Sequence, residues 1–184
     1  MDVLEAIHSR ASAVRLDKPA PSREQMTRIL EAGTRAPDHG KLAPWRFIVL
    51  ENESRSILGK AMIEAMREKM PGATENDLER ERAKVDRAPV IVAVAAKTID
   101  KGVKIPQIEQ VLAAGAASQN IFLAANALGF GAMWKTGDAA YNPLVKRALG
   151  LEPQDHIVAF LYIGTVVTPG QPKKPNMEGR IQFL

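Results

Sequence analysis

Residues 89–96 read PVIVAVAA, a continuous apolar run that follows directly on a proline. A half-exposed strand alternates apolar and polar side chains, whereas this run has no polar position. It therefore predicts a strand that is buried on both faces. Residues 45–50, which are rich in aromatic and β-branched side chains, predict a second strand, and residues 132–135 and 157–167 predict two more.

Helical patterns surround these strands. The longest covers residues 107–128, and Ser22 with Gln25 three positions later forms a capping box that begins another. Shorter helices are predicted over residues 2–9, 54–70, 74–86 and 142–149. Helices outnumber strands and do not alternate regularly with them, which favours an α+β fold with one central sheet in a single domain, residues 1–184. The tail from Thr168 contains three prolines and two glycines and is expected to be extended and docked.

The composition narrows the function. Hydrophobic residues make up 46% of the chain and charged residues 25%, as in ordinary globular proteins. The sequence has no cysteine, which excludes disulfides, thiolate nucleophiles and cysteine-bound metals. Its three histidines stand far apart, so no metal site is expected.

Neither nucleic acid nor a membrane is an expected partner. The net charge is +4 with a pI near 9.4, but the basic runs also contain acids and aromatics are only 5%. The apolar stretch 111–130 is interrupted by three amides, which are costly in lipid. The N-terminus has no signal-peptide pattern, so a cytoplasmic location is expected.

Three segments could carry chemistry. In the first, RASAVR at residues 10–15, Arg10 and Ser12 could grip a phosphate on a turn. The alternative is that Arg10 caps a helix and Arg15 forms a surface ion pair. The second, RAPDHGK at residues 35–41, is a rigid cationic loop that could form a site or serve as a structural crossover.

The third segment is GFGAMWKTG, residues 129–137. Its glycine pair could admit a flat ligand, with Trp134 covering it and Lys135 and Thr136 adding polar contacts. The alternative is a helix stop followed by a strand, which needs Gly129 alone. No nucleophile elbow, P-loop, HExxH or paired catalytic carboxylate accompanies these segments, so an enzyme of this sequence would take its chemistry from a cofactor.

Taken in order, these segments resemble the FMN-dependent nitroreductase family, and in particular its short, YdjA-like members. The resemblance covers residues 2–167 and rests on Arg-x-Ser at 10–12, Arg-Ala-Pro-Asp-His at 35–39 with Pro-Trp at 44–45, and Gly-Phe-Gly-x-x-Trp at 129–134. It implies a nitroreductase-like fold with a mostly antiparallel sheet flanked by helices. It also implies an intertwined homodimer with FMN at the interface.

The resemblance also implies site residues. Arg10, Ala11 and Ser12 would hold FMN, Ala11 through its backbone, and Arg35 and His39 would reach FMN from the partner chain. The family pattern places Trp134, Lys135 and Thr136 along the flavin and residues 124–129 near the nicotinamide nucleotide. Either Lys135 or Arg10 would supply the positive charge at the N1 edge of the reduced flavin. No side chain is assigned as a catalytic residue, because the flavin carries the chemistry.

The activity implied is transfer of hydride from NADH or NADPH through flavin to nitro compounds, quinones or similar small-molecule acceptors, by a ping-pong mechanism. Two alternatives remain open: a reductase of another acceptor class, and a non-catalytic protein that sequesters FMN. A nucleic-acid-binding module, suggested only by the pI, ranks behind both. The charged segment 71–88 is a candidate lid over the flavin.

Overall fold

The sheet is built around the apolar run at its centre. The structure is a computed structural model and describes residues 2–172 and 175–184. Strand β3 (Val90–Ala96) is buried along its whole length and pairs with β2 (Trp45–Glu51) on one side and β5 (His156–Thr168) on the other. Every pairing is antiparallel. The predicted central, doubly buried strand is confirmed.

The free edge of β5 is shared by two short strands. β4 (Gly131–Lys135) pairs with residues 160–164 of β5, and β1 (Arg15–Asp17) pairs with the stretch that follows. β1 has three residues, too few for a strand pattern, and the sequence did not predict it. The backbone N–H of Ala13 donates to the carbonyl of Ala132 at 3.0 Å. The segment just before β1 therefore lies against the start of β4.

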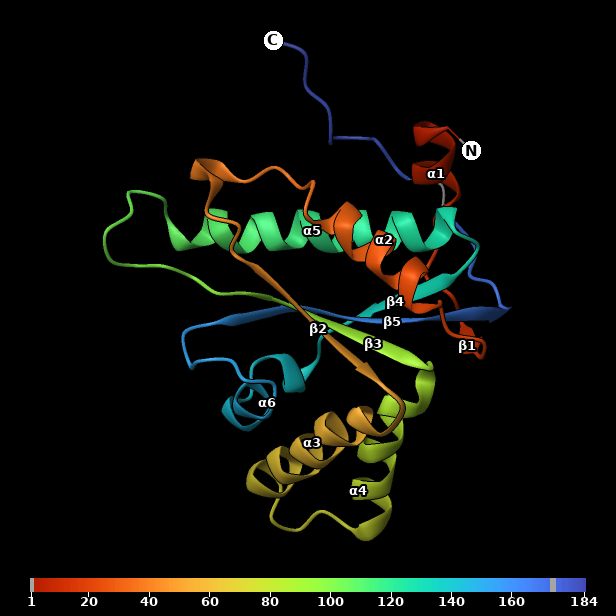
Figure 1. Cartoon of the computed structure of the whole chain (residues 1–184), viewed down its shortest axis with the longest axis vertical. Helices are drawn as coiled ribbons and strands as arrows, with labels where there is room; N and C mark the ends of the chain where they lie inside the picture. The colour runs from red at the N-terminus through yellow and green to blue at the C-terminus, as the bar shows by residue number, and fades with distance from the viewer. Residues whose placement is uncertain (1, 173–174) are drawn as a thin grey trace.

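Helices cover both faces of this sheet (Figure 1). On one face lie α2 (Arg23–Gly33), which begins at the predicted capping box of Ser22, and α5 (Gln107–Ala127). The other face carries α3 (Arg55–Lys69), α6 (Pro143–Ala148) and α4 (Glu75–Arg82), which continues as the 3₁₀ helix Ala83–Arg87. The predicted helices are confirmed, except that the end of the segment 74–86 is 3₁₀. Each face has its own apolar cluster.

Residues 113–118 of α5 are all small, and part of this stretch serves packing within this chain. Ala113, Ala114 and Ala117 are buried in the described chain, and a Cβ on Gly33 of α2 would lie 2.8 Å from Ile121 Cγ1 of α5. Small residues thus let α2 and α5 approach each other closely.

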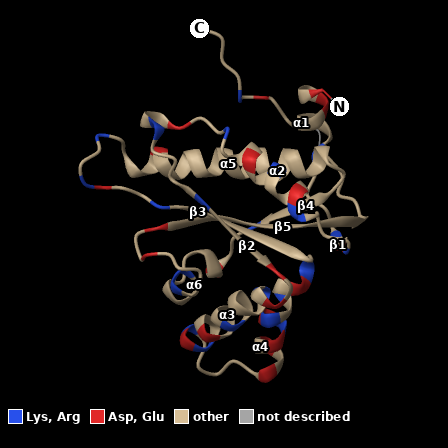
Figure 2. Cartoon of the chain, viewed as in Figure 1, with Lys and Arg blue, Asp and Glu red and all other residues tan. Residues whose placement is uncertain are grey.

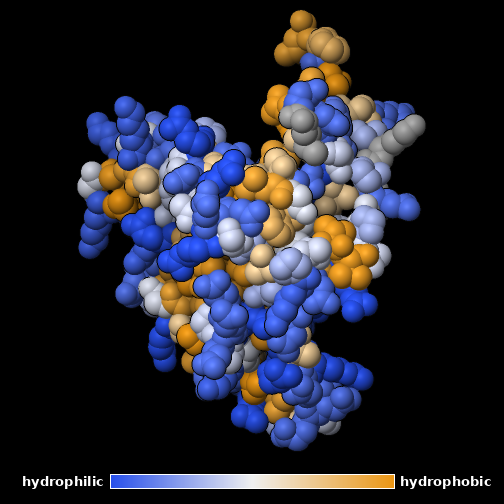
Figure 3. Space-filling model, turned by 45° about the vertical axis from the view of Figure 1, so that its right-hand side comes forward, coloured by the Kyte–Doolittle hydropathy of each residue, from blue (hydrophilic) through white to orange (hydrophobic). Residues whose placement is uncertain are grey.

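Apolar side chains remain exposed on α5, on α1 and on the C-terminal tail. α5 carries a single charged residue, Glu109, and exposes Ile108 and Leu112 on its outer side, whereas α3 and α4 are covered with charges of both signs (Figure 2). Helix α1 (Val3–Ser9) buries none of its residues. The C-terminal tail projects from the body with apolar side chains at its end (Figure 3), including Phe183, which is 93% exposed. Of the predicted docked tail, residues 173–174 lie outside the described residues.

Candidate functional site

The segment Arg10–Ser12 links α1 to β1 and presents polar groups that the chain does not use. The Arg10 guanidinium stands over the Phe122 ring of α5, 4.8 Å from its centroid. Within residues 2–172 and 175–184, neither the Arg10 nor the Ser12 side chain makes an ion pair or a hydrogen bond. The surface ion pair considered for Arg15 is also absent there. A guanidinium and a hydroxyl are therefore available to an anion.

The C-terminal segment holds this turn in place. The carbonyl of Thr168 accepts a hydrogen bond from the Val14 backbone at 3.0 Å. Two residues later, a Cβ on Gly170 would lie 1.9 Å from the Ser12 carbonyl oxygen. Only glycine fits there without displacing the Arg10–Ser12 backbone, so the start of the tail positions the turn.

Strand β4, which starts beside this turn, forms the middle of the third predicted segment, residues 129–137. Lys135 is four residues beyond Gly131, about 13 Å at ~3.3 Å per residue. Because side chains alternate along a strand, Trp134 packs in the apolar cluster beside α5 whereas Lys135 lines a cavity on the α3 side. The structure therefore separates these two predicted side chains onto opposite faces of the sheet, and Thr136 lies with Lys135 at the cavity.

The two glycines of this segment, Gly129 before β4 and Gly131 at its first position, serve the fold. Gly129 has φ 84° and ends α5, as the packing alternative expected. A Cβ on Gly131 would lie 2.5 Å from Val166 Cγ2 and 2.8 Å from Leu16 Cδ2. The interpretation that this glycine opens space for a flat ligand is therefore wrong, because β5 and β1 fill that space.

Two hollows adjoin at the end of β4. One is open, measures about 450 Å³ and lies beside β1, where Val14 and Arg15 line it. The other, about 280 Å³, lies between α3, the 3₁₀ helix Ala83–Arg87, β5 and the turn after β4. Lys135 and Arg87 line both hollows. Neither hollow is lined by Arg10 or Ser12, and the cations that border the open hollow are Arg15, Arg87 and Lys135.

The second hollow is lined by more cations than acids. Lys69 Nζ lies 2.5 Å from Asp138 Oδ2, and this contact holds the pKa of Asp138 below its ordinary value. Lys84 pairs with Glu81 in the same way. Arg87 and Lys135 have no ion-pair partner within the described part of the chain. The two remaining positive charges favour an anionic ligand.

His39 lies elsewhere, whereas Arg35 follows Gly33 by two residues and so lies near Ile121, next to Phe122 on α5. His39 Nδ1 is 2.5 Å from Glu109 Oε2 at the start of α5, whereas Arg10 stands over Phe122 near the end of that helix. Thirteen residues at ~1.5 Å each separate the two contacts by about 20 Å. Figure 1 shows the same arrangement, with the His39 turn and α1 at opposite ends of α5. One copy of the chain does not bring His39 to Arg10.

The loop that carries His39 is conformationally demanding. Lys41 and Ala43 both have positive φ, 56° and 46°, in addition to Gly40 at 73°. Such conformations are unfavourable for residues with a side chain and concentrate at functional sites. The Ala43 backbone donates to Asp38 Oδ2 at 2.6 Å, which helps to hold the loop.

Apart from Lys135 and Thr136, sequence reasoning missed the polar residues of the second hollow. Arg87 stood in a mixed-charge run that indicates a solvated helix, and Tyr162 stood in an apolar strand. A phenol within an otherwise apolar strand was the available signal, because a buried hydroxyl needs a partner. The charged segment 71–88 does border this hollow, through Glu81, Lys84 and Arg87.

The described residues contain neither a metal-binding cluster nor a membrane-spanning helix. No three His, Cys, Asp or Glu side chains in residues 2–172 and 175–184 gather closely enough to hold a metal ion. Over the same ranges, no helix has both the length and the apolar character needed to cross a bilayer.

The fold is α+β, and its Arg10–Ser12 turn offers hydrogen-bond donors that the described chain leaves unused. The sequence matches the Nitroreductase family over residues 7–165, and the chain belongs to that family. It is therefore an oxidoreductase, and the family prediction and the predicted fold class are confirmed.

Individual relatives agree with this assignment. A protein of Escherichia coli (strain K12), provisionally named NAD(P)H nitroreductase YdjA, is 41% identical over 169 residues, 90% of this chain and 88% of that protein. The crystal structure of a nitroreductase-like family protein from Bacillus cereus has a TM-score of 0.84 at 25% identity, covering 100% of this chain and 96% of the other. A Desulfovibrio desulfuricans protein, provisionally called a nitroreductase and solved in complex with FMN, has a TM-score of 0.77 at 28% identity, covering 100% and 97%.

Proposed function

We propose that this protein is an FMN-dependent oxidoreductase that uses NADH or NADPH as electron donor, and that residues 1–184 act as one FMN-binding domain. The observation that carries the proposal is the Arg10–Ser12 turn, whose guanidinium and hydroxyl have no partner in the described chain and which is hydrogen-bonded to β4 through Ala13 and Ala132. This donor set fits FMN, which has a phosphate at one end and a flat ring at the other. The FMN complex of the Desulfovibrio relative supports the choice of cofactor.

Each group of this chain has a simple role in the proposal. Arg10 and Ser12 bind the phosphate, Ala11 contributes only backbone, and Lys135 and Thr136 contact the ring end. Bound FMN supplies the redox chemistry, taking hydride from NAD(P)H and passing it to a nitro compound, quinone or similar acceptor in ping-pong order. Lys135 adds a positive charge where negative charge develops. No nucleophilic side chain is needed.

We further propose that the working unit is a homodimer whose sites combine both copies. His39 lies about 20 Å along α5 from Arg10, so in this proposal it completes the site of the partner, together with Arg35, which the family resemblance also assigns to the partner chain. The exposed apolar side chains on α5 and on the projecting tail support such an interface.

An absorption spectrum followed by anaerobic addition of NADH or NADPH tests the function. The expected result is a yellow protein that bleaches with at least one of the two nucleotides. A yellow protein that neither nucleotide bleaches would favour the alternative of FMN sequestration. A colourless protein that cannot be reconstituted with FMN would refute the proposal.

Mixing two variants tests the shared site. Arg10→Ala and Arg35→Ala should each lose FMN when prepared alone. If the dimer site takes Arg10 from one copy and Arg35 from the other, co-expression should restore about one site in four, because half the dimers are mixed and each has one intact site. FMN content of purified protein is the readout. No recovery on mixing would show that each site belongs to a single copy.

Gly170→Ala tests whether the tail positions the phosphate-binding turn. The added Cβ clashes with the Ser12 carbonyl, so we expect the turn to shift and the Kd for FMN to rise about tenfold, within the 1–3 kcal/mol typical of overpacking. Gly72→Ala is the matched control, since a Cβ there meets nothing within 4 Å. Fluorescence titration with FMN measures both. Equal affinities in the two variants would contradict the role of Gly170.

A further inference from the structure

The second hollow contains a buried phenol that the proposed FMN contacts do not use. Tyr162 on β5 is only 3% exposed and lines the hollow, yet its hydroxyl makes no hydrogen bond within residues 2–172 and 175–184. Burial raises the pKa of Tyr162 despite the opposing charge of Arg87, so the hydroxyl stays protonated at neutral pH. The phenol ring is buried while its unpartnered, protonated hydroxyl is accessible from the hollow, so it is a donor free to meet an acceptor there.

The walls around this hydroxyl suit a flat apolar group. Met62 and Met66 lie at i and i+4 on α3, and Met70 caps the end of that helix. All three line the hollow, with Phe160 on β5 also in the wall. Methionine side chains adapt to aromatic faces and edges, and aromatic walls favour planar ligands. The volume, about 280 Å³, is close to the lower end of small-ligand sites.

The polar groups of the hollow favour an anion. Its two acids, Glu81 and Asp138, are paired with Lys84 and Lys69, which leaves Arg87 without an ion-pair partner in the described chain. Arg87 and the Tyr162 hydroxyl are both donors, and a carboxylate accepts from both.

We propose that this hollow binds an aromatic carboxylate, with its ring against the methionines and Phe160 and its carboxylate at Tyr162 and Arg87. The inference rests on the proposed function in one respect, that this ligand is the electron acceptor. Lys135 and Thr136 line the hollow and are also the proposed contacts to the flavin ring, so the two ligands would be neighbours. With 4-nitrobenzoate as probe, hydride from NAD(P)H and one proton convert the nitro group to nitroso and release water.

Binding measured without turnover tests the proposal. The purified protein, with and without added FMN, is titrated by calorimetry with 4-nitrobenzoate and with its neutral analogue 4-nitrobenzamide. We expect the carboxylate to bind about tenfold more tightly, the size of one charge-assisted hydrogen bond. Arg87→Gln should remove this preference, and Tyr162→Phe, which preserves ring packing, should weaken carboxylate binding several-fold.

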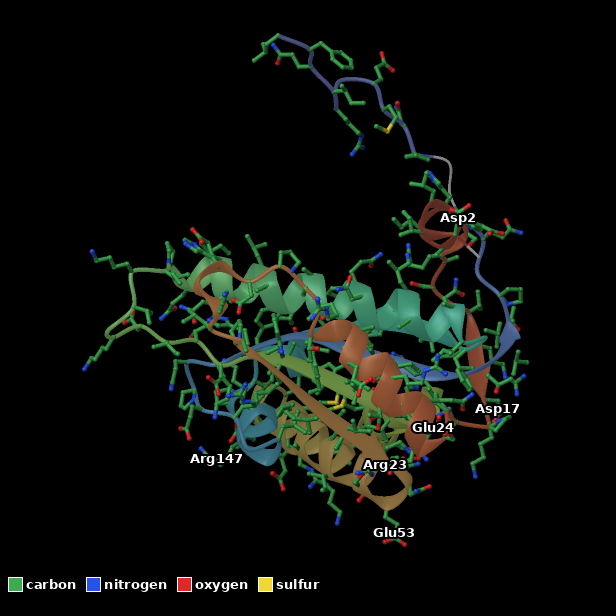
Figure 4. The ribbon with its side chains drawn as sticks, turned by 45° about the horizontal axis from the view of Figure 1, so that its top comes forward. Asp2, Asp17, Arg23, Glu24, Glu53 and Arg147 are labelled. Atoms are coloured by element: carbon green, nitrogen blue, oxygen red, sulfur yellow. The ribbon has the colours of Figure 1, made fainter. Side chains whose placement is uncertain are left out.

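The control is Arg23→Gln, the same change on an exposed residue of α2, on the other face of the sheet (Figure 4). It should leave both affinities unchanged. Equal affinities for carboxylate and amide, equal effects of Arg23→Gln and Arg87→Gln, or competition between FMN and the probe would each overturn the proposal. Normal probe binding by a protein that does not take up FMN would leave this site standing and refute the proposed function instead.

Discussion

Arg10→Ala is expected to weaken FMN binding by about 10- to 100-fold, because a hydrogen bond to a charged group contributes ~1.5–3 kcal/mol. Arg10 is half-buried beside Phe122, and its guanidinium has no acceptor among the described residues. A phosphate would be its first strong partner, and arginine meets phosphate with two parallel hydrogen bonds. Arg10→Lys keeps the charge but not this geometry, so an intermediate Kd is expected.

The measurement is a fluorescence titration of apoprotein with FMN. Arg147→Ala is the control, since Arg147 is an exposed arginine on α6, well away from Asp17 and β1 in Figure 4. Thermal unfolding of the apoprotein should be nearly the same for Arg10→Ala and wild type. An unchanged Kd for FMN in Arg10→Ala would remove this residue from the site.

Leu161→Ala should give the largest loss of stability. Leu161 is fully buried on β5, where β3 and β4 pair on either side, and packs in the cluster beneath α2 and α5. Replacing a fully buried leucine with alanine costs ~2–5 kcal/mol, including the cavity that remains. That is a large fraction of the ~5–15 kcal/mol that stabilises a typical domain.

Urea unfolding of the apoprotein, followed by circular dichroism, checks this value. Val167→Ala on the exposed end of the same strand is the matched control, with an expected change within ~0.5 kcal/mol. If Leu161→Ala cost less than 1 kcal/mol, the packing of β5 at the centre of the sheet would be wrong.

Local patterns predicted most of the fold because they reflect short-range physics. The apolar run at residues 90–96 has no polar position, and such a strand is stable only when covered on both faces. The Ser22–Gln25 capping box forms as expected, since both hydrogen bonds join residues three apart. β1 escaped prediction because its three residues are held by pairing with β5, a partner about 150 positions away.

The proposed FMN contacts, too, could be predicted only in part from the sequence. The sequence picked out Arg10, Ser12, Arg35 and His39 as candidate ligand contacts, because few other polar groups stand in such rigid segments. The sequence could not give the distances between these residues. Only the folded chain places Arg10 and His39 at opposite ends of α5. That separation is the physical argument for a site shared between two copies.

The sequence alone determined most of the segments that become strands and helices, and which family the chain resembles, because these depend on local periodicity and on the order of short motifs. Only the tertiary structure decided that Lys135 faces the α3 side while Trp134 faces α5, and that Gly131 serves packing. It alone placed Tyr162 and Arg87 in one hollow. These outcomes depend on strand register and on contacts between residues distant in the chain, which no local pattern encodes.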